Sequence, residues 1–487
     1  MRLTSIYRRG SASWAVGQSG VVGKRSGETG GSMIDRLAAA VGAPVLVSGQ
    51  GDYEAVRGLF NGRAEGRPVA IVRCRDANDV ATAIRFARDE GVEVRVRAGG
   101  HNPAGQCLDD DVLLIDLRDC DVVDVDPHNR TATVGGGARW KQADEATLPH
   151  GLAAPGGDCC VVGAAGYTLG GGHGLLSRAY GLGCDNLVGA ELVDAEGTIR
   201  RVDEDSEPDF LWALRGGGGN FGAVTKLELA LHPVPELLFA GARIWPVSQA
   251  RDVMRAYRDI VGAGLPDEFT LCMNIAREPF PDGDPCLVVY GAFLGDETEG
   301  AAILAPLNAA AAPAMDVFSM MPYSVVQTLS EEDITERGHG LRGLWKGGFF
   351  AGNLTDDAID AVLDAYARAP SPTCRAHFDF LGGGAVGRVD AAATAFPHRQ
   401  HTYGVQFLAL WPGTEGDEVN MTWAREAKAA VQPYLGGGVY SGYGDPDLDD
   451  WARAYYGGNL ERLVDLKRRY DPDNVFRFRQ GLSEIAG

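Results

Sequence analysis

The stretch from Leu152 to Gly174, LAAPGGDCCVVGAAGYTLGGGHG, is the part of the sequence that decides the fold. It combines two adjacent cysteines, Cys159 and Cys160, with a density of glycine that an ordinary helix or strand does not tolerate. Because backbone without side chains can approach a ligand closely, we expect a large, flat molecule to lie against this stretch.

A second stretch lies upstream. The alternation of Val92, Val94 and Val96 predicts a strand, which runs into the turn Arg97-Ala98-Gly99-Gly100-His101-Asn102. The two glycines free the backbone and present the histidine at the mouth of the turn. We therefore interpret the two stretches as parts of one site.

Together, these stretches resemble the berberine-bridge-enzyme-like flavoprotein oxidases, which have the vanillyl-alcohol-oxidase type of FAD-binding fold. Further matching segments extend the resemblance from about residue 50 to the end of the chain, at 183–186, 193–197, 214–222, 396–399 and 470–476. The resemblance implies an α+β protein of two domains. Its parts would be an FAD-binding domain at 34–235, a substrate-binding domain of antiparallel sheet backed by helices at 236–438, and a segment returning to the FAD-binding domain at 439–487.

The length of the chain agrees with this division, and its composition limits the classes of partner. Single hydrophobic cores usually stop growing near ~250–300 residues, so a chain of 487 residues is expected to form two domains. No run of about 18 apolar residues is present that could span a bilayer. The net charge of −21 repels phosphate backbones, so we expect no nucleic-acid partner. Nine cysteines, an odd number scattered along the chain, do not indicate a disulfide framework.

The first 33 residues are expected to be disordered, since they carry Arg8-Arg9 and Lys24-Arg25 among serine and glycine. They lack the apolar segment of a secretory signal, so we expect a cytoplasmic protein, with twin-arginine export as the open alternative. Met33 stands directly before a helical pattern from Asp35 to Val41, which makes it an alternative start to Met1.

Periodicity predicts a helix from Asp76 to Glu90 that ends at Gly91, and a long amphipathic helix from Asp447 to Arg469. Alternating or continuous apolar runs predict strands at Val112–Leu117, Thr131–Val134, Leu187–Val193, Val224–Leu231, Cys286–Tyr290 and Val405–Leu410.

Glycine is spread over four loops, at 99–105, 135–137, 156–174 and 216–222, and does not have the GxGxxG spacing of a nicotinamide-binding fold. Several backbone stretches would then hold the pyrophosphate and the flavin. With the resemblance, the expected cofactor-binding residues besides the attachment points are Arg97, Gly99, Gly100, Asn102, Gly157, Val162, Gly163, Gly166, Gly170, Gly171, Asn220 and Gly222.

Two covalent links to FAD follow from the resemblance. The position of His101 bonds to the 8α-methyl carbon of the flavin in the family, and that of Cys159, four residues before Gly163, bonds to C6. The alternatives are a turn histidine satisfied by nearby backbone and a small buried cysteine, which is our interpretation of Cys160. The residue at Val162 controls in the family how closely dioxygen approaches the flavin, although ordinary packing explains a valine equally well.

Tyr443 is the expected catalytic base. It belongs to Tyr440-Ser441-Gly442-Tyr443-Gly444-Asp445, which resembles the family's YxNYxD segment, with Gly442 in place of the usual asparagine. Removing hydride from an alcohol carbon requires a group that takes the hydroxyl proton. A phenol with an ordinary pKa near ~10 must be assisted to do so, and a core tyrosine is the alternative.

Three further residues complete the expected catalytic set. Gln406 matches the active-site position that is glutamate in the bond-forming members, and an amide cannot be a general base. Tyr403 lies on the opposite face of the same predicted strand, and would either orient the substrate oxygen or belong to the core. His173 occupies the variable position of GGGxG, and would face the substrate cavity or remain a solvated loop histidine.

The predicted function is an FAD-dependent oxidase that removes hydride from the alcohol carbon of a sugar, glycoside or natural product and reduces dioxygen to hydrogen peroxide. Its partners would be that small molecule and dioxygen, while the oligomeric state stays open. Amine oxidation, or a dehydrogenase with another acceptor, remains possible within the fold. From other classes, the alternatives are a binding module without catalysis and a zinc protein with Cys159, Cys160 and His173 as ligands. Their spacing lacks a second metal-binding element, so we expect no metal.

Overall fold

The structure, a computed structural model, describes residues 32–277, 283–327 and 340–486. The prediction of disorder over residues 1–33 therefore lies outside the described part, except for Ser32 and Met33. Ser32 caps helix α1 (Met33–Ala40), because its side chain accepts a hydrogen bond from the backbone N–H of Asp35.

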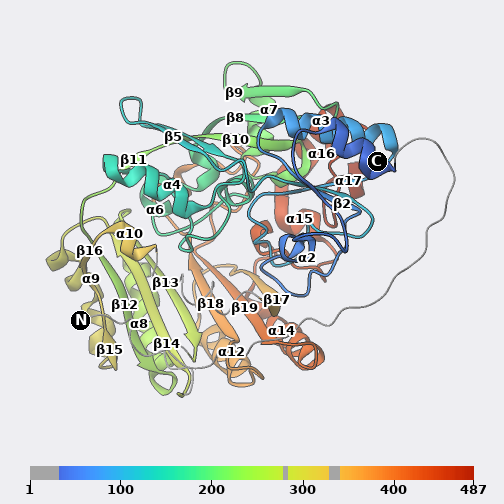
Figure 1. Ribbon diagram of the computed structural model, residues 1–487. Coiled ribbons are helices and arrows are strands. Elements are labelled where there is room, and N and C mark those ends of the chain that lie inside the picture. The colour runs from blue at the N-terminus through green and yellow to red at the C-terminus, as the bar shows by residue number, and fades with distance from the viewer. Residues whose placement is uncertain (1–31, 278–282, 328–339, 487) are drawn as a thin grey trace.

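Two sheets are built from the first half of the chain and lie at the top of Figure 1. The four-stranded sheet has the order β1-β2-β4-β3, in which β4 pairs in parallel with β2 and β3. The five-stranded sheet is antiparallel, with the order β5-β6-β10-β8-β9. The strands are β1 (Val45–Leu46), β2 (Ala70–Arg73), β3 (Val94–Arg97), β4 (Leu113–Asp116), β5 (Val123–Asp126), β6 (Thr131–Gly135), β8 (Leu187–Val193), β9 (Ile199–Asp203) and β10 (Ala223–Ala230).

Helix α3 (Ala77–Glu90) shows why the local predictions succeed here. Asp76 accepts hydrogen bonds from the N–H groups of Asn78 and Asp79, and Gly91 ends the helix with a φ of 69°. Both ends are thus set by the residue types that capping requires.

The remaining short elements connect these sheets or cover them. They are β7 (Leu152–Ala153), β11 (His232–Pro233), α2 (Tyr53–Arg57), α4 (Trp140–Thr147), α5 (Ala164–Leu169), α6 (Ser177–Tyr180), α7 (Pro208–Leu214), α10 (Tyr323–Val326), α13 (Gly384–Arg388) and α17 (Ser483–Ala486).

An eight-stranded antiparallel sheet dominates the second half and lies at the bottom of Figure 1. Its order is β15-β12-β14-β13-β18-β19-β17, with β16 also paired to β12. The strands are β12 (Leu238–Pro246), β13 (Phe269–Ala276), β14 (Cys286–Phe293), β15 (Met315–Asp316), β16 (Ser319–Met321), β17 (Leu341–Phe349), β18 (Arg375–Phe380) and β19 (Tyr403–Pro412).

The four long helices of this half of the chain cover one face of this sheet, while the short helices α6 and α10 pack against the ends of β12 and β13 on the other face. The apolar side chains of the four long helices and those of the strands form the largest core, to which α8 (Ala250–Ala263), α9 (Glu297–Ala310), α12 (Asp356–Ala367) and α14 (Asp417–Val431) contribute. Since side chains alternate across a sheet, every second residue of each strand points to the other face, toward the glycine-rich loops.

The predicted helix from Asp447 to Arg469 is in fact two helices, α15 (Trp451–Tyr456) and α16 (Leu460–Tyr470). Gly457, with a φ of +48°, breaks the chain direction, and the Asn459 amide donates hydrogen bonds to the carbonyls of Ala391 and Thr394. An Asn side chain that bonds to a distant loop and a glycine pair override the amphipathic pattern.

Helices mixed with mostly antiparallel sheets confirm the predicted α+β class. The boundaries at residues 235 and 438 stay predictions. In the described residues, no helix is both long and apolar enough to cross a membrane. All nine cysteines are described, and each is a free thiol.

Candidate functional site

A cavity of about 990 Å³ lies between the glycine-rich loops and this other face of the eight-stranded sheet. His101, Cys159 and His173 line it from the loops, Gln406 from the sheet, and Tyr443 from the C-terminal segment. The structure therefore brings together residues that lie more than 300 positions apart in the sequence.

Glycine is required where the two loop stretches meet. A Cβ atom on Gly99 would lie 2.6 Å from the backbone nitrogen of Gly163, and a Cβ on Gly163 would lie 2.5 Å from that of Gly99. Both distances are shorter than any real Cβ contact, so only glycine allows the two backbones to pack together. The cavity they border is large enough for a dinucleotide with a substrate, so the residues present fit FAD.

Most of the predicted cofactor-binding residues line this cavity. They are Gly99, Gly100, His101, Asn102, Gly157, Cys159, Val162, Gly163, Gly166, Gly170 and Gly222.

Three predicted cofactor-binding residues are placed elsewhere. Arg97, the last residue of β3, is buried, and its guanidinium donates to Asp116 at 2.6 Å. Gly171 leaves room for the ring of Phe396, which a Cβ would approach to 2.7 Å. Asn220 accepts from the backbone N–H of Leu482 at 2.8 Å and so holds the end of the chain.

The two expected attachment residues differ in their surroundings. His101 stacks on the ring of Phe60, with ring centroids 4.0 Å apart. Cys159 is 6% exposed, and burial raises the pKa of its thiol to about 12, which keeps it protonated at neutral pH. Its neighbour Cys160 is more deeply buried, in agreement with the interpretation of Cys160 as a packing residue.

Sequence reasoning missed the carboxylate at the centre of the site, Asp379 on β18. Oδ1 of Asp379 accepts from the Tyr443 hydroxyl at 3.4 Å, lies 2.7 Å from Nε2 of His377, and lies 3.6 Å from Nδ1 of His173. The signal was the segment Arg375-Ala-His-Phe-Asp-Phe380, in which polar and apolar residues alternate as a half-buried strand requires.

The pKa values of the two possible proton acceptors, Tyr443 and Asp379, are shifted in opposite directions. Burial raises the pKa of Tyr443 well above its ordinary value, and the charge of Asp379 raises it further. Burial also disfavours an ionised Asp379, but the nearby His173 and His377 outweigh it, so the pKa of Asp379 is lowered. The resting site therefore holds a neutral phenol beside an ionised carboxylate.

The histidine on β18 is the counterpart of this carboxylate. Burial lowers the pKa of His377, but the charge of Asp379 and its hydrogen bond raise it further than burial lowers it. Its other ring nitrogen, Nδ1, lies 2.7 Å from Oδ1 of Asn274. Both nitrogens thus face oxygen atoms, an arrangement that suits a protonated imidazole.

Strand β19 separates its two expected catalytic residues. Gln406 faces the cavity, whereas Tyr403 points into the core beneath α8 and is fully buried. The role of Tyr403 in orienting the substrate is therefore corrected to one of core packing, which the period of two along a strand explains.

The segment that carries Tyr443 is fixed by the glycine loop. The hydroxyl of Tyr440 accepts from the N–H of Gly172 at 3.1 Å. A Cβ at Gly442 would lie 2.4 Å from the ring of Tyr440, so this ring leaves room only for glycine. The departure from the family's asparagine thus has a steric reason within this chain.

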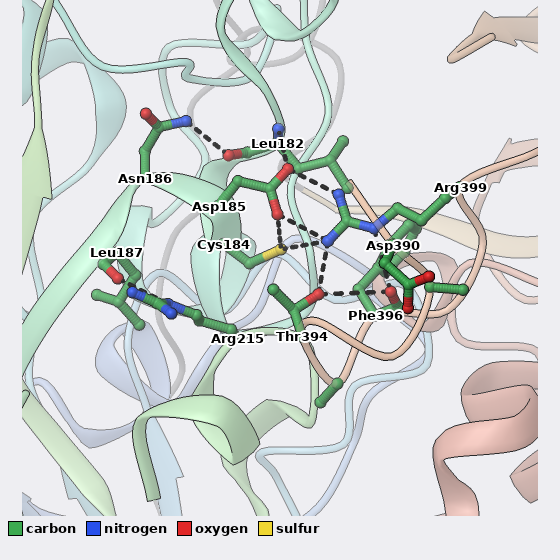
Figure 2. A network of polar contacts seen from close by, with 12 residues as sticks. Leu182, Cys184, Asp185, Asn186, Leu187, Arg215, Asp390, Thr394, Phe396 and Arg399 are labelled. Atoms are coloured by element: carbon green, nitrogen blue, oxygen red, sulfur yellow. Dashed lines mark hydrogen bonds and ion pairs between the residues drawn. The ribbon is translucent and has the colours of Figure 1, made fainter. Parts of the chain in front are cut away.

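A buried ion pair positions the loop of His173 (Figure 2). Arg399, fully buried, donates to both carboxylate oxygens of Asp185 at 2.7 Å. The segment of Asp185 in turn bonds to the GGG loop, because the N–H groups of Gly183 and Cys184 donate to the carbonyls of Gly172 and Gly171. The pair links loops more than 200 residues apart in the sequence.

Within residues 32–277, 283–327 and 340–486, no group of three or more histidine, cysteine, aspartate or glutamate side chains could hold a metal ion. The zinc alternative, with Cys159, Cys160 and His173, finds no ligand set in this part of the chain.

Two family models match the chain: one described as an FAD binding domain over residues 68–203, and one described as berberine and berberine like over residues 439–483. The uncharacterized FAD-linked oxidoreductase YvdP of Bacillus subtilis is 31% identical over 446 residues, which are 90% of this chain and 97% of the relative. The (R)-6-hydroxynicotine oxidase of Paenarthrobacter nicotinovorans is 30% identical over 89% of this chain and 95% of its own.

Among solved structures, glucooligosaccharide oxidase from Acremonium strictum superposes with a TM-score of 0.83 at 27% identity. The match covers 93% of this chain and 98% of that one. That oxidase is described as carrying 6-S-cysteinyl, 8α-N1-histidyl FAD.

Proposed function

Because the chain belongs to the berberine-bridge-enzyme-like family of FAD-linked oxidoreductases, we propose that it is an oxidase acting on the alcohol carbon of a sugar, glycoside or natural product. The observation that carries this proposal is the pairing of Tyr443 with Asp379 at the cavity that His101 and Cys159 also line. An alcohol oxidation needs a proton acceptor, which this pair can provide, since the hydroxyl proton must leave as hydride leaves carbon.

We further propose that FAD is attached through His101 and Cys159. Both residues line the same cavity, on the two stretches whose backbones meet at Gly99 and Gly163. The double linkage described for glucooligosaccharide oxidase, through one histidine and one cysteine, supports the assignment.

FAD held by the loops of His101 and Cys159 would supply the hydride acceptor for the substrate carbon and, with dioxygen as the final acceptor, the route to hydrogen peroxide. The residues of the chain would accept the proton of the substrate hydroxyl. The Tyr443 oxygen takes the proton of the substrate hydroxyl while its own proton passes to Asp379, which leaves a neutral carboxylic acid and a carbonyl product. This relay avoids a free tyrosinate, which burial disfavours.

Two other residues would orient the alcohol. Gln406 is 3% exposed at the cavity wall and can donate to or accept from the substrate oxygen. His173 also lines the cavity, with its Nδ1 3.6 Å from Oδ1 of Asp379 and its ring 5.6 Å from that of Tyr443. Val162, which also lines the cavity, would leave room for dioxygen.

The experiment has two parts. Purified protein that stays yellow after acid denaturation carries covalent flavin, and a colourless protein removes the proposal. With a substrate that bleaches the flavin without oxygen, admitting air should restore the colour rapidly and release peroxide. Reoxidation much slower in air than with an artificial quinone would identify a dehydrogenase.

A further inference from the structure

On the cavity face of the eight-stranded sheet, one half of a row of residues is polar and the other half is apolar. This row of opposed residues crosses six strands, from β19 through β18, β13, β14 and β12 to β15. All of its members line the cavity, and in this order they are Gln406, His377, Asn274, Val288, Ile244 and Met315. The first three are polar and the last three are apolar.

The apolar half continues beyond this row. Ala242 on β12 and Val317, just after β15, also line the cavity, and the N–H of Val317 donates to the carbonyl of Ala242. We call Ala242, Ile244, Val288, Met315 and Val317 the apolar wall. Tyr290 is the polar exception nearby, and its hydroxyl donates to Asp158 at 2.9 Å.

The polar half already uses much of its hydrogen-bonding capacity internally. The two ring nitrogens of His377 face Asn274 and Asp379, and Asp379 also accepts from Tyr443. These groups suit one reacting hydroxyl rather than the several hydroxyls of a sugar ring.

A sugar lying along the sheet from this reacting point would press further hydroxyls against the apolar wall. Each buried hydroxyl without a partner lowers affinity by about tenfold or more, whereas hydrocarbon placed there gains affinity by leaving water. The two halves together therefore select for a molecule that is polar at one end only.

We propose that the substrate is an alcohol borne on a mainly hydrocarbon body, aromatic or aliphatic, whose body lies on the apolar wall while its hydroxyl meets Tyr443. This rests on the proposed alcohol oxidase function and narrows it, since the sugars and glycosides would be poor substrates.

The test is anaerobic flavin reduction by the FAD-loaded full chain. Cinnamyl alcohol and cyclohexylmethanol are compared with cellobiose and methyl glucoside, and the second-order rate constant of flavin reduction is expected to favour the hydrocarbon alcohols by about 100-fold or more. Flavin reduction that is equal or faster with the sugars overturns this proposal and leaves the oxidase function standing. Reduction by neither group of alcohols overturns both.

A substitution that conserves the shape of the side chain tests whether the body of the substrate lies on the apolar wall. Val288→Thr adds a hydroxyl to the apolar wall at nearly constant volume, so KM for the hydrocarbon alcohol should rise about tenfold while kcat changes little. Val122→Thr, at a position that is 68% exposed, is the matched control and should change neither constant. An unchanged KM in Val288→Thr would place the body of the substrate elsewhere and overturn the proposal.

Discussion

The two walls of the cavity are built on opposite principles. The loop wall contributes mainly backbone, and its glycines are fixed by contacts such as that between Gly99 and Gly163. The sheet wall contributes side chains, taken from every second position of strands that are distant in the sequence. The loop wall is therefore suited to hold a cofactor and can change little, whereas the sheet wall can change its chemistry one residue at a time.

The largest expected effect tests whether the loop wall holds the cofactor. His101→Ala and Cys159→Ala should each leave flavin attached through the other residue, and the double variant should release all of it on acid denaturation. Cys160→Ala is the matched control, because Cys160 is buried next in the chain and should leave both links intact. A single link in the flavin-peptide mass of the wild type, with an unchanged spectrum in Cys159→Ala, would refute the second attachment.

The next effect concerns the sheet wall. Asp379→Asn and Tyr443→Phe should each slow flavin reduction by ~10²–10⁴, or roughly 3–5 kcal/mol of transition-state stabilisation, without loss of flavin. Because the two residues act in one relay, the double variant should be little slower than either single variant.

Stopped-flow reduction without oxygen measures these rates. Tyr403→Phe is the control, since it removes a phenolic hydroxyl on the opposite face of the same sheet and should leave the rate within a few-fold of wild type. Fully additive losses in the double variant would separate Asp379 from the proton transfer and leave Tyr443 to act with another group.

The same contrast explains what the sequence could predict. The loop wall could be predicted because its glycines and cysteines form contiguous motifs. These motifs indicated the berberine-bridge-enzyme-like family, and the comparisons confirm that assignment. Gly171 and Asn220 are not among the residues that line the cavity, and their part in cofactor binding stays a prediction, because a motif does not distinguish a glycine that faces the cavity from one that makes room for Phe396.

The sheet wall was harder to predict from one sequence. Asp379 and His377 share strand β18 but are separated by more than 60 residues from Tyr443, and only the folding of the C-terminal segment against the sheet brings them together. Their strand has the right alternation, but alternation does not say which face meets a cavity and which a core. Tyr403 was predicted to be catalytic because it carries a phenol, but its side of the strand faces the core and not the cavity.

The smallest effect is a shift in pH dependence, and it tests whether the sheet wall tunes its own carboxylate. His377→Gln keeps an N–H donor for Asp379 but removes the positive charge that helps to lower the pKa of Asp379. That pKa should rise, so the acidic limb of the flavin-reduction profile should move to higher pH by about one unit, with no change on the alkaline side. At a fixed pH within the limb, this shift corresponds to a rate about tenfold lower.

The stability of the protein should follow with a defined sign. The lowered pKa of Asp379 stabilises the fold above its unfolded pKa of ~3.9, and this contribution is lost as the pH falls through the folded value. The raised pKa of His377 stabilises the fold below its unfolded pKa of ~6.5, and this contribution is lost as the pH rises through the folded value. The deficit in Tm of His377→Gln should therefore be largest between these two unfolded values and should shrink in alkaline buffer.

His377→Lys, which retains a cation, should keep the acidic limb of the flavin-reduction profile near its wild-type position. An unshifted limb in His377→Gln would assign the charge that holds Asp379 ionised to His173 instead, at 3.6 Å on the loop wall, and the tuning would then come from the cofactor side of the cavity.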